Sequence, residues 1–197
     1  MLNVDNVSDD RLKELIEGCV RNHRKSQESI YKMFYGKMMA ICRRYTKNSD
    51  QAKDILQDGF IKVFKNIDKF NFEGSFEGWV RRIIVNTAID FTRKAKNDYL
   101  LMNENQSIDD FDEDLLDEDD EEPYENPLKV GDVIEGMNKL SKAYRTVFNL
   151  YVFDNYTHQE IADALNISVG TSKSNLAKAR ANLKKILTKE LEKRDGE

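Results

Sequence analysis

The chain has 197 residues, of which 40% are hydrophobic and 34% are charged, and its formal net charge is −5. This length holds one large domain or two small ones, each with its own core. No apolar run approaches the roughly 20 residues of a transmembrane helix, and the N-terminal sequence MLNVDNVSDD lacks the regions of a signal peptide. The sequence therefore argues against membrane insertion, and we expect a cytoplasmic protein.

The acidic side chains are concentrated in one stretch. Residues 103–125 hold 13 of the 36 acidic residues and contain no lysine or arginine. Without this stretch the chain has 31 basic and 23 acidic residues, which gives a net charge of +8. The rest of the chain is therefore basic, as a protein that binds an anionic partner should be.

Three amphipathic helices are predicted before residue 65. Apolar residues recur at helical spacing over residues 8–21, 30–45 and 52–64, with polar breaks at 22–27 and 48–50. The exposed face of the third helix combines hydrogen-bond acceptors with one large apolar side chain; its members are Asp54, Gln57, Asp58 and Phe60. Such a face suits docking on a basic protein surface, and an ordinary solvated helix face is the alternative.

The cysteines give no sign of a metal site or a disulfide. Cys19 and Cys42 have no CxxC spacing, and we expect both to be free, buried thiols. His23 shares a helix face with Cys19, but two ligands are too few for a zinc site. We therefore expect no cofactor here.

Residues 66–78 are predicted to form a loop, because Gly, Asn and Asp interrupt the helical pattern there. Phe70, Phe72 and Phe76 of this loop either fold back into the core or stack on unpaired bases. The next helix, predicted over residues 75–96, has a core row and a second row about 120° away. The second row carries a stacking ring, polar groups and cations, and lysines extend it; its members are Trp79, Arg82, Asn86, Asp90, Arg93, Lys94 and Lys96. We predict that this row binds DNA.

The acidic stretch lies within residues 97–126, which we predict to form an extended, disordered linker, because like charges repel and apolar residues are few. Its acids match the first, third, fifth and twelfth positions of a calcium-binding loop; these are Asp110, Asp112, Asp114 and Glu121. Leu115 occupies the sixth position, where that loop needs a glycine, so we expect no calcium site.

Residues 127–197 are predicted to form a second helical domain. One helix is expected over residues 130–140, and another over 144–152 with Tyr151 and Val152 on its apolar side. A helix–turn–helix, the unit that many proteins place in the major groove of DNA, is then expected over residues 157–187.

The turn of this helix–turn–helix has a clear sequence signature. Thr157 and Glu160 match a capping box, Asn166 suits a left-handed turn, and Ser168 can cap the second helix. His158 is expected to face solvent or a phosphate. The outer face of the second helix has donors and no carboxylate; its members are Thr171, Ser174, Asn175, Lys178, Asn182 and Lys185, with Lys173 at the flank. An ordinary solvated helix is the alternative to DNA binding.

Several motifs occur in an order that resembles the extracytoplasmic-function group of bacterial sigma factors. They are DILQDGF at 54–60, WVRRI at 79–83 followed by Asn86, AID at 88–90, Arg93, EIA at 160–162 and ISVGT at 167–171. The resemblance covers nearly the whole chain outside the linker. It implies an all-α fold with two small helical domains, sigma region 2 at 1–96 and sigma region 4 at 127–197, joined by the flexible acidic linker.

The resemblance also implies partners and site residues. The acidic face of the third helix would dock on the clamp helices of the largest subunit of core RNA polymerase; its residues are Asp54, Gln57, Asp58 and Phe60. The loop and the following helix would capture a flipped base and contact the opened −10 element of the promoter; the residues are Phe70, Phe72, Trp79, Arg82, Asn86, Arg93 and Lys94. The second domain would sit on the polymerase flap and read the −35 element in the major groove; the residues are Thr171, Lys173, Ser174, Asn175 and Lys178. The family also makes an anti-sigma factor a candidate partner.

This chain departs from the family pattern on the recognition helix. Ser172, Asn175 and Lys178 stand where family members often carry Val, Arg and Arg. Loss of two guanidinium groups removes bidentate readout of guanine, so we expect a different −35 sequence preference.

The expected function is that of a dissociable transcription initiation factor without chemistry of its own. A free-standing helix–turn–helix regulator is the alternative, but it leaves the Trp79 row and the acidic face at residues 54–60 unexplained. An enzyme is disfavoured, because the sequence has no Ser-His-Asp grouping, no glycine-rich phosphate loop and only two histidines.

Overall fold

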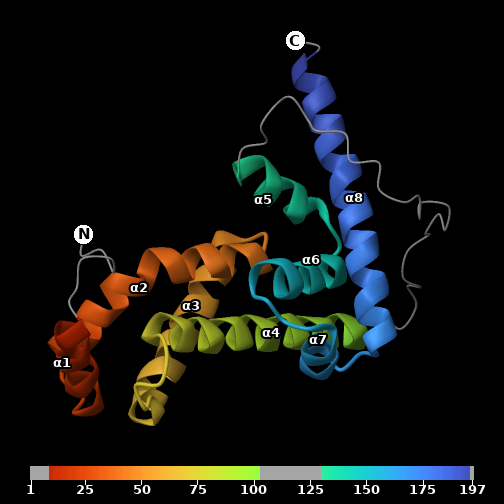
Figure 1. Ribbon diagram of the computed structural model, residues 1–197. Coiled ribbons are helices and arrows are strands. Elements are labelled where there is room, and N and C mark those ends of the chain that lie inside the picture. The colour runs from red at the N-terminus through yellow and green to blue at the C-terminus, as the bar shows by residue number, and fades with distance from the viewer. Residues whose placement is uncertain (1–8, 103–129, 196–197) are drawn as a thin grey trace. The chain divides into compact units, whose positions relative to one another are not determined.

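The computed structural model describes residues 9–102 and 130–195, and every regular element in these ranges is a helix (Figure 1). This confirms the all-α fold class that the apolar periodicity predicts. The chain divides into two compact units, Met1–Phe91 and Thr92–Glu197. The acidic stretch and its calcium-like spacing lie outside the described residues. In the part of the chain that is described, no helix is both long and apolar enough to cross a bilayer.

The first unit is a helical bundle in which α2 packs against both α1 and α3. In chain order its elements are α1 (Asp9–Val20), α2 (Arg24–Tyr45), α3 (Ser49–Asn66), the 3-10 turn η2 (Ile67–Lys69) and the part of α4 (Phe76–Met102) up to Phe91. Ile30 and Phe34 of α2, Val63 of α3, and Val80 and Ile84 of α4 are fully buried. The apolar stripes predicted for these helices therefore form one core.

The corner between α1 and α2 is tighter than the polar sequence at 22–27 predicts. Asn22 turns the chain with a φ of 58°, and α2 already begins at Arg24. Ser26 is buried and lies 2.9 Å from the His23 Nδ1 atom. A Cβ atom on Gly18 would overlap the Ser26 hydroxyl, so the close approach of α1 requires a glycine there. Polar residues are thus buried at this corner because the two helices meet there.

Helix α4 is held against α3 by a second close approach. A Cβ atom on Gly59 of α3 would overlap the buried Ile84 side chain of α4. Because Ile84 faces inward, the row of α4 that begins at Trp79 and includes Arg82 and Asn86 lies on the other side. The helix continues past the expected end at residue 96, to Met102.

The second unit is built around the long helix α8, which packs against α5, α6 and α7 (Figure 1). Its elements are α5 (Val130–Lys139), α6 (Lys142–Phe148), the π-helical turn η3 (Asn149–Phe153), α7 (His158–Leu165) and α8 (Val169–Asp195). Met137, Val147, Leu150, Ile161 and Ala179 are fully buried. Each helix of this unit contributes to one common core.

The π-helical turn corrects one prediction about this core. A continuous helix over 144–152 would place Tyr151 and Val152 on the buried side, but they are 36% and 40% exposed. The wider turn η3 inserts an extra residue per turn, so Asn149 and Leu150 become buried instead. A π-helical insertion of this kind is often found at functional sites.

Candidate nucleic-acid interfaces

The acidic face of α3 is on the surface, as the sequence predicts. Asp54, Gln57 and Asp58 are all exposed and follow one another at helical spacing. Phe60 is different, because it is only 2% exposed and its ring packs 4.7 Å from that of Tyr31. Phe60 therefore belongs to the core, and the expectation that it offers exposed apolar surface is corrected.

A tyrosine that the sequence analysis passed over is exposed on the neighbouring helix. Tyr35 of α2 is 37% exposed, and its ring lies 5.6 Å from that of Tyr31. The pKa of the Lys53 ammonium on α3 is raised chiefly by its pair with Asp50, with a smaller contribution from Tyr35. Its position outside the apolar stripe of α2 could have indicated from the sequence that Tyr35 is exposed.

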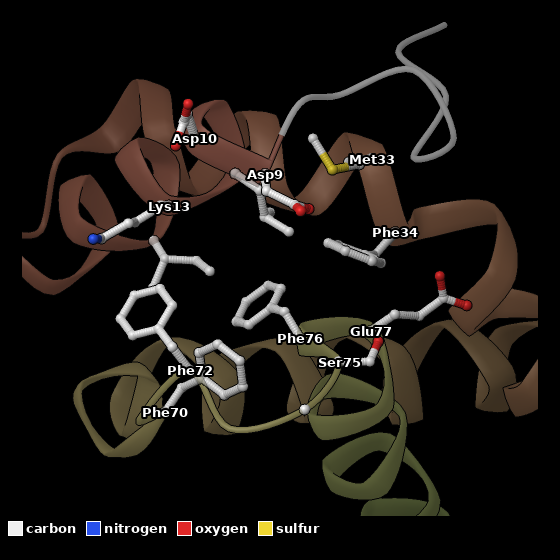
Figure 2. Close-up of a pocket in the computed structure, with 13 residues that line it drawn as sticks. Asp9, Asp10, Lys13, Met33, Phe34, Phe70, Phe72, Ser75, Phe76 and Glu77 are labelled. Carbon is white, nitrogen blue, oxygen red and sulfur yellow. The ribbon is translucent and has the colours of Figure 1, made fainter.

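An aromatic cavity separates the loop after η2 from helices α1 and α2 (Figure 2). It has a volume of about 530 Å³, and its aromatic lining consists of Phe34, Phe70, Phe72 and Phe76. Phe70 and Phe76 are 7% and 4% exposed, whereas Phe72 is 48% exposed. Two of the three loop phenylalanines thus fold back into the core, and Phe72 alone among them keeps a solvent-accessible ring.

Phe72 is held in an unusual backbone conformation. Its φ is 63°, in the left-handed region that bulky residues rarely adopt. Its ring lies 5.2 Å from that of Phe70, which in turn contacts the half-buried Trp79 at 5.7 Å. Trp79 also stacks on Phe76, with centroids 5.7 Å apart and an interplanar angle of 21°. The aromatic cluster is therefore continuous from the core to an exposed edge.

The second row of α4 lies on the surface beyond this cluster. Arg82, Asn86 and Arg93 are exposed, as DNA contacts would require. The carboxylate of Asp90 lies 3.0 Å from the Lys62 ammonium of α3, so a cation offsets the one acid in the row. Lys94 lies within α4, but its side chain is outside the described residues.

In the second unit, the geometry of the helix–turn–helix follows the sequence signature closely. The Glu160 amide donates to Thr157 Oγ1 at 3.2 Å, and the Thr157 amide donates to Glu160 Oε2 at 2.8 Å. Asn166 adopts φ 54° and ψ 53°, which ends α7 in the left-handed conformation. The Thr171 amide donates to Ser168 Oγ at 2.9 Å. The capping box, the turn and the second cap are thus confirmed.

The outer face of α8 presents polar groups to solvent. Thr171, Lys173 and Ser174 are exposed, and Asn175 and Lys178 are partly exposed. The Thr171 hydroxyl also lies 2.8 Å from Ser168 Oγ, so the cap already engages it. The predicted face is therefore accessible to a ligand from solvent.

His158 connects three elements of this unit, which the sequence analysis missed. Its Nδ1 atom lies 3.0 Å from the hydroxyl of Ser172, which is fully buried in α8. Its ring stacks on Tyr151 of η3, with centroids 4.6 Å apart at 25°. The guanidinium of Arg180 lies 5.9 Å from the centroid of the Tyr151 ring. His158 is therefore half-buried between helices rather than turned to solvent.

The two cysteine thiols are buried, and neither is activated as a nucleophile. Cys19 and Cys42 are free, and burial raises the pKa of Cys19 to about 11 and that of Cys42 to about 12. Within residues 9–102 and 130–195, no group of three His, Cys, Asp or Glu side chains is placed to hold a metal ion. Neither thiol has the lowered pKa of a reactive cysteine.

Comparison with known proteins identifies both units. Residues 30–97 match the family described as sigma-70 region 2, and residues 131–183 match sigma-70, region 4. The chain is 31% identical over 180 residues to the ECF RNA polymerase sigma factor SigW of Bacillus subtilis (strain 168), covering 89% of this chain and 96% of the relative. It is 27% identical over 178 residues to RNA polymerase sigma factor SigV of the same organism, covering 90% and 94%. A co-crystal structure of the sigma factor RpoE with the anti-sigma factor NepR from Bartonella quintana has a similar fold, with a TM-score of 0.50 at 20% identity, covering 82% of this chain and 96% of that chain.

Proposed function

The chain belongs to the extracytoplasmic-function group of the sigma-70 family, and from this premise we propose how its exposed surfaces divide the task. As a sigma factor it acts in transcription initiation, with core RNA polymerase and promoter DNA as its partners. We assign polymerase docking and −10 recognition to the first unit and −35 recognition to the second. The chemistry of RNA synthesis belongs to the core enzyme.

Docking is assigned to the acidic face of α3. The exposed carboxylates of Asp54 and Asp58 and the Gln57 amide would pair with basic groups on the clamp helices of the largest polymerase subunit. Tyr35 adds an exposed aromatic ring beside this face, and aromatic residues are enriched at protein interfaces. Phe60 contributes indirectly, because it supports α3 from within the core. The second unit would make a separate contact with the polymerase flap.

Recognition of the −10 element is assigned to the surface that joins the loop to α4. Phe72 and Trp79 offer ring faces on which unpaired bases can stack, while Arg82 and Arg93 can bind phosphates and Asn86 a base edge. A base that stacks outside the duplex cannot return to it, so this surface would favour the opened state of the promoter. Lys94 would extend the cationic row.

Recognition of the −35 element is assigned to α8. Its exposed N-terminal half would enter the major groove, with Lys173 and Lys178 at phosphates or guanine and Ser174 and Asn175 at base edges. Thr171 would contact the DNA backbone near the helix N-terminus.

An anti-sigma factor, of the kind bound to RpoE in the similar structure, would hold the chain inactive by covering one of these three surfaces.

The observation that carries the proposal is the row of half-buried Trp79 and exposed Arg82 and Asn86 in the same unit as the acidic α3 face. A free-standing helix–turn–helix regulator would need neither surface. The test is transcription in vitro: core RNA polymerase should gain defined start sites when the chain is added, while the isolated chain should bind duplex promoter weakly. Tight binding of the isolated chain to a duplex operator, without any start-site selectivity in the presence of core enzyme, would overturn the proposal.

A further inference from the structure

Helix α1 forms one wall of the aromatic cavity beside the loop. Leu12, Lys13 and Ile16 of α1 line the cavity opposite Phe70 and Phe72. This helix ends at Val20, before the first residue that matches the region 2 family, which is residue 30. Helix α1 therefore lies outside the segment that matches the region 2 family.

Lys13 is placed at the exposed end of this cavity. Its ammonium lies 5.8 Å from the centroid of the Phe72 ring, within the range of a cation–π contact. Figure 2 shows Lys13 at the Phe72 end and Glu77 at the opposite end. Among the described residues Lys13 has no carboxylate at ion-pair distance, whereas Glu77 is paired with Lys37 at 2.8 Å. The ammonium of Lys13 is therefore available to an anion from outside the unit.

The strain at Phe72 points to the same end of the cavity. Phe72 has a φ of 63°, which costs free energy, and its ring is 48% exposed. Burial of the ring therefore offsets little of that cost. Strained residues of this kind cluster at functional sites. A volume of about 530 Å³ with aromatic walls suits one planar, unpaired base.

We propose that α1 completes the site that captures the opened promoter strand, and that Lys13 binds the phosphate next to the captured base while it positions the Phe72 ring. This inference rests on the proposed function. Asp9 and Asp10, one helical turn before Lys13 on α1, also line the cavity, so Lys13 is the one cation among the described residues that line it. Lys13 is a positioning and phosphate-binding residue, because it does not contact the base edge.

The test uses holoenzyme, assembled from core RNA polymerase and the full chain, with a labelled single-stranded oligonucleotide that carries the −10 sequence. Lys13→Met should weaken binding roughly three- to tenfold, to the same extent for each base at the captured position. The slope of log affinity against log salt should fall by about 0.7, the value for one contact to single-stranded DNA. Lys13→Arg should retain affinity, because it keeps both the charge and the contact with the ring.

Two control variants separate this inference from the function on which it rests. Lys25→Met removes an exposed charge from the first turn of α2 and should leave binding unchanged. Phe72→Ala should weaken binding if the loop captures the strand; if it does not, the proposed −10 surface is wrong. If Phe72→Ala weakens binding but Lys13→Met changes neither affinity nor salt slope, the role of Lys13 alone is refuted. A loss of affinity with an unchanged slope, or without rescue by Lys13→Arg, also overturns the phosphate contact.

Discussion

Replacing His158 by alanine is expected to destabilise the second unit and to loosen its recognition helix. The substitution leaves the Ser172 hydroxyl fully buried without its partner, which costs about 1–3 kcal/mol. It also removes the stack on Tyr151, worth about 0.5–1.5 kcal/mol. We therefore expect a loss of about 1.5–4.5 kcal/mol, a large fraction of the stability of a small domain.

The single tryptophan of the chain makes the measurement specific to one unit. Trp79 lies in the first unit, so its fluorescence reports unfolding there, while far-UV circular dichroism follows both units. In urea titrations of the full chain, His158→Ala should shift the dichroism transition of the second unit and leave the Trp79 midpoint unchanged. Transcription from promoters that depend on the −35 element should fall more than polymerase binding does.

A double-mutant cycle tests the reasoning behind this magnitude. His158→Asn places an amide near the position of Nδ1 and should recover part of the loss, since it restores the hydrogen bond without the stack. Ser172→Ala in the His158→Ala background should cost little, because no buried hydroxyl is then left without a partner. A loss below about 0.5 kcal/mol for His158→Ala, or no coupling between the two positions, would refute the reasoning.

Three further outcomes are expected. Asp58→Lys should weaken binding of the chain to core polymerase roughly tenfold at low salt, whereas Glu17→Lys on α1 should not; equal effects would remove the α3 face from the interface. Lys173→Ala should lower holoenzyme affinity for −35 duplex uniformly across sequences, with a salt slope smaller by about 0.9, and an unchanged slope would exclude a phosphate contact. Burial raises the pKa of the Cys42 thiol from the ordinary 9.0 to about 12. Raising the pH above 9 therefore ionises this thiol only in the unfolded chain, so the free energy of unfolding should fall, and Cys42→Ala should show a smaller fall in urea titrations.

Features that depend on neighbouring residues could be predicted from the sequence. The capping box at Thr157 and the left-handed turn at Asn166 each follow from side chains within a few residues, and both are present. The exposed row of α4 could also be predicted, because helical geometry places Arg82 and Asn86 on one side of the helix. In each case the physical cause lies within one or two turns of the chain.

Features that depend on packing between elements could not be predicted in this way. Periodicity predicts a continuous helix through Tyr151, and only the tertiary packing of Asn149 and Leu150 accounts for the π-helical turn. Phe70 lies in a loop without periodicity, so nothing local decides whether its ring is buried. The contact of Lys13 with Phe72 joins an N-terminal helix to a distant loop, and no sequence spacing encodes it.

Two residues with a left-handed backbone conformation, Asn166 and Phe72, need different explanations. Asn166 and Phe72 have φ values of 54° and 63°, and both lie beside proposed DNA-binding elements. Asparagine adopts this conformation readily, so the turn of the helix–turn–helix needs no further explanation. Phenylalanine does not, and the exposed ring of Phe72 recovers little of the cost through burial. A glycine or asparagine would relieve the strain, and we propose that phenylalanine is retained because its ring contacts the bound promoter strand.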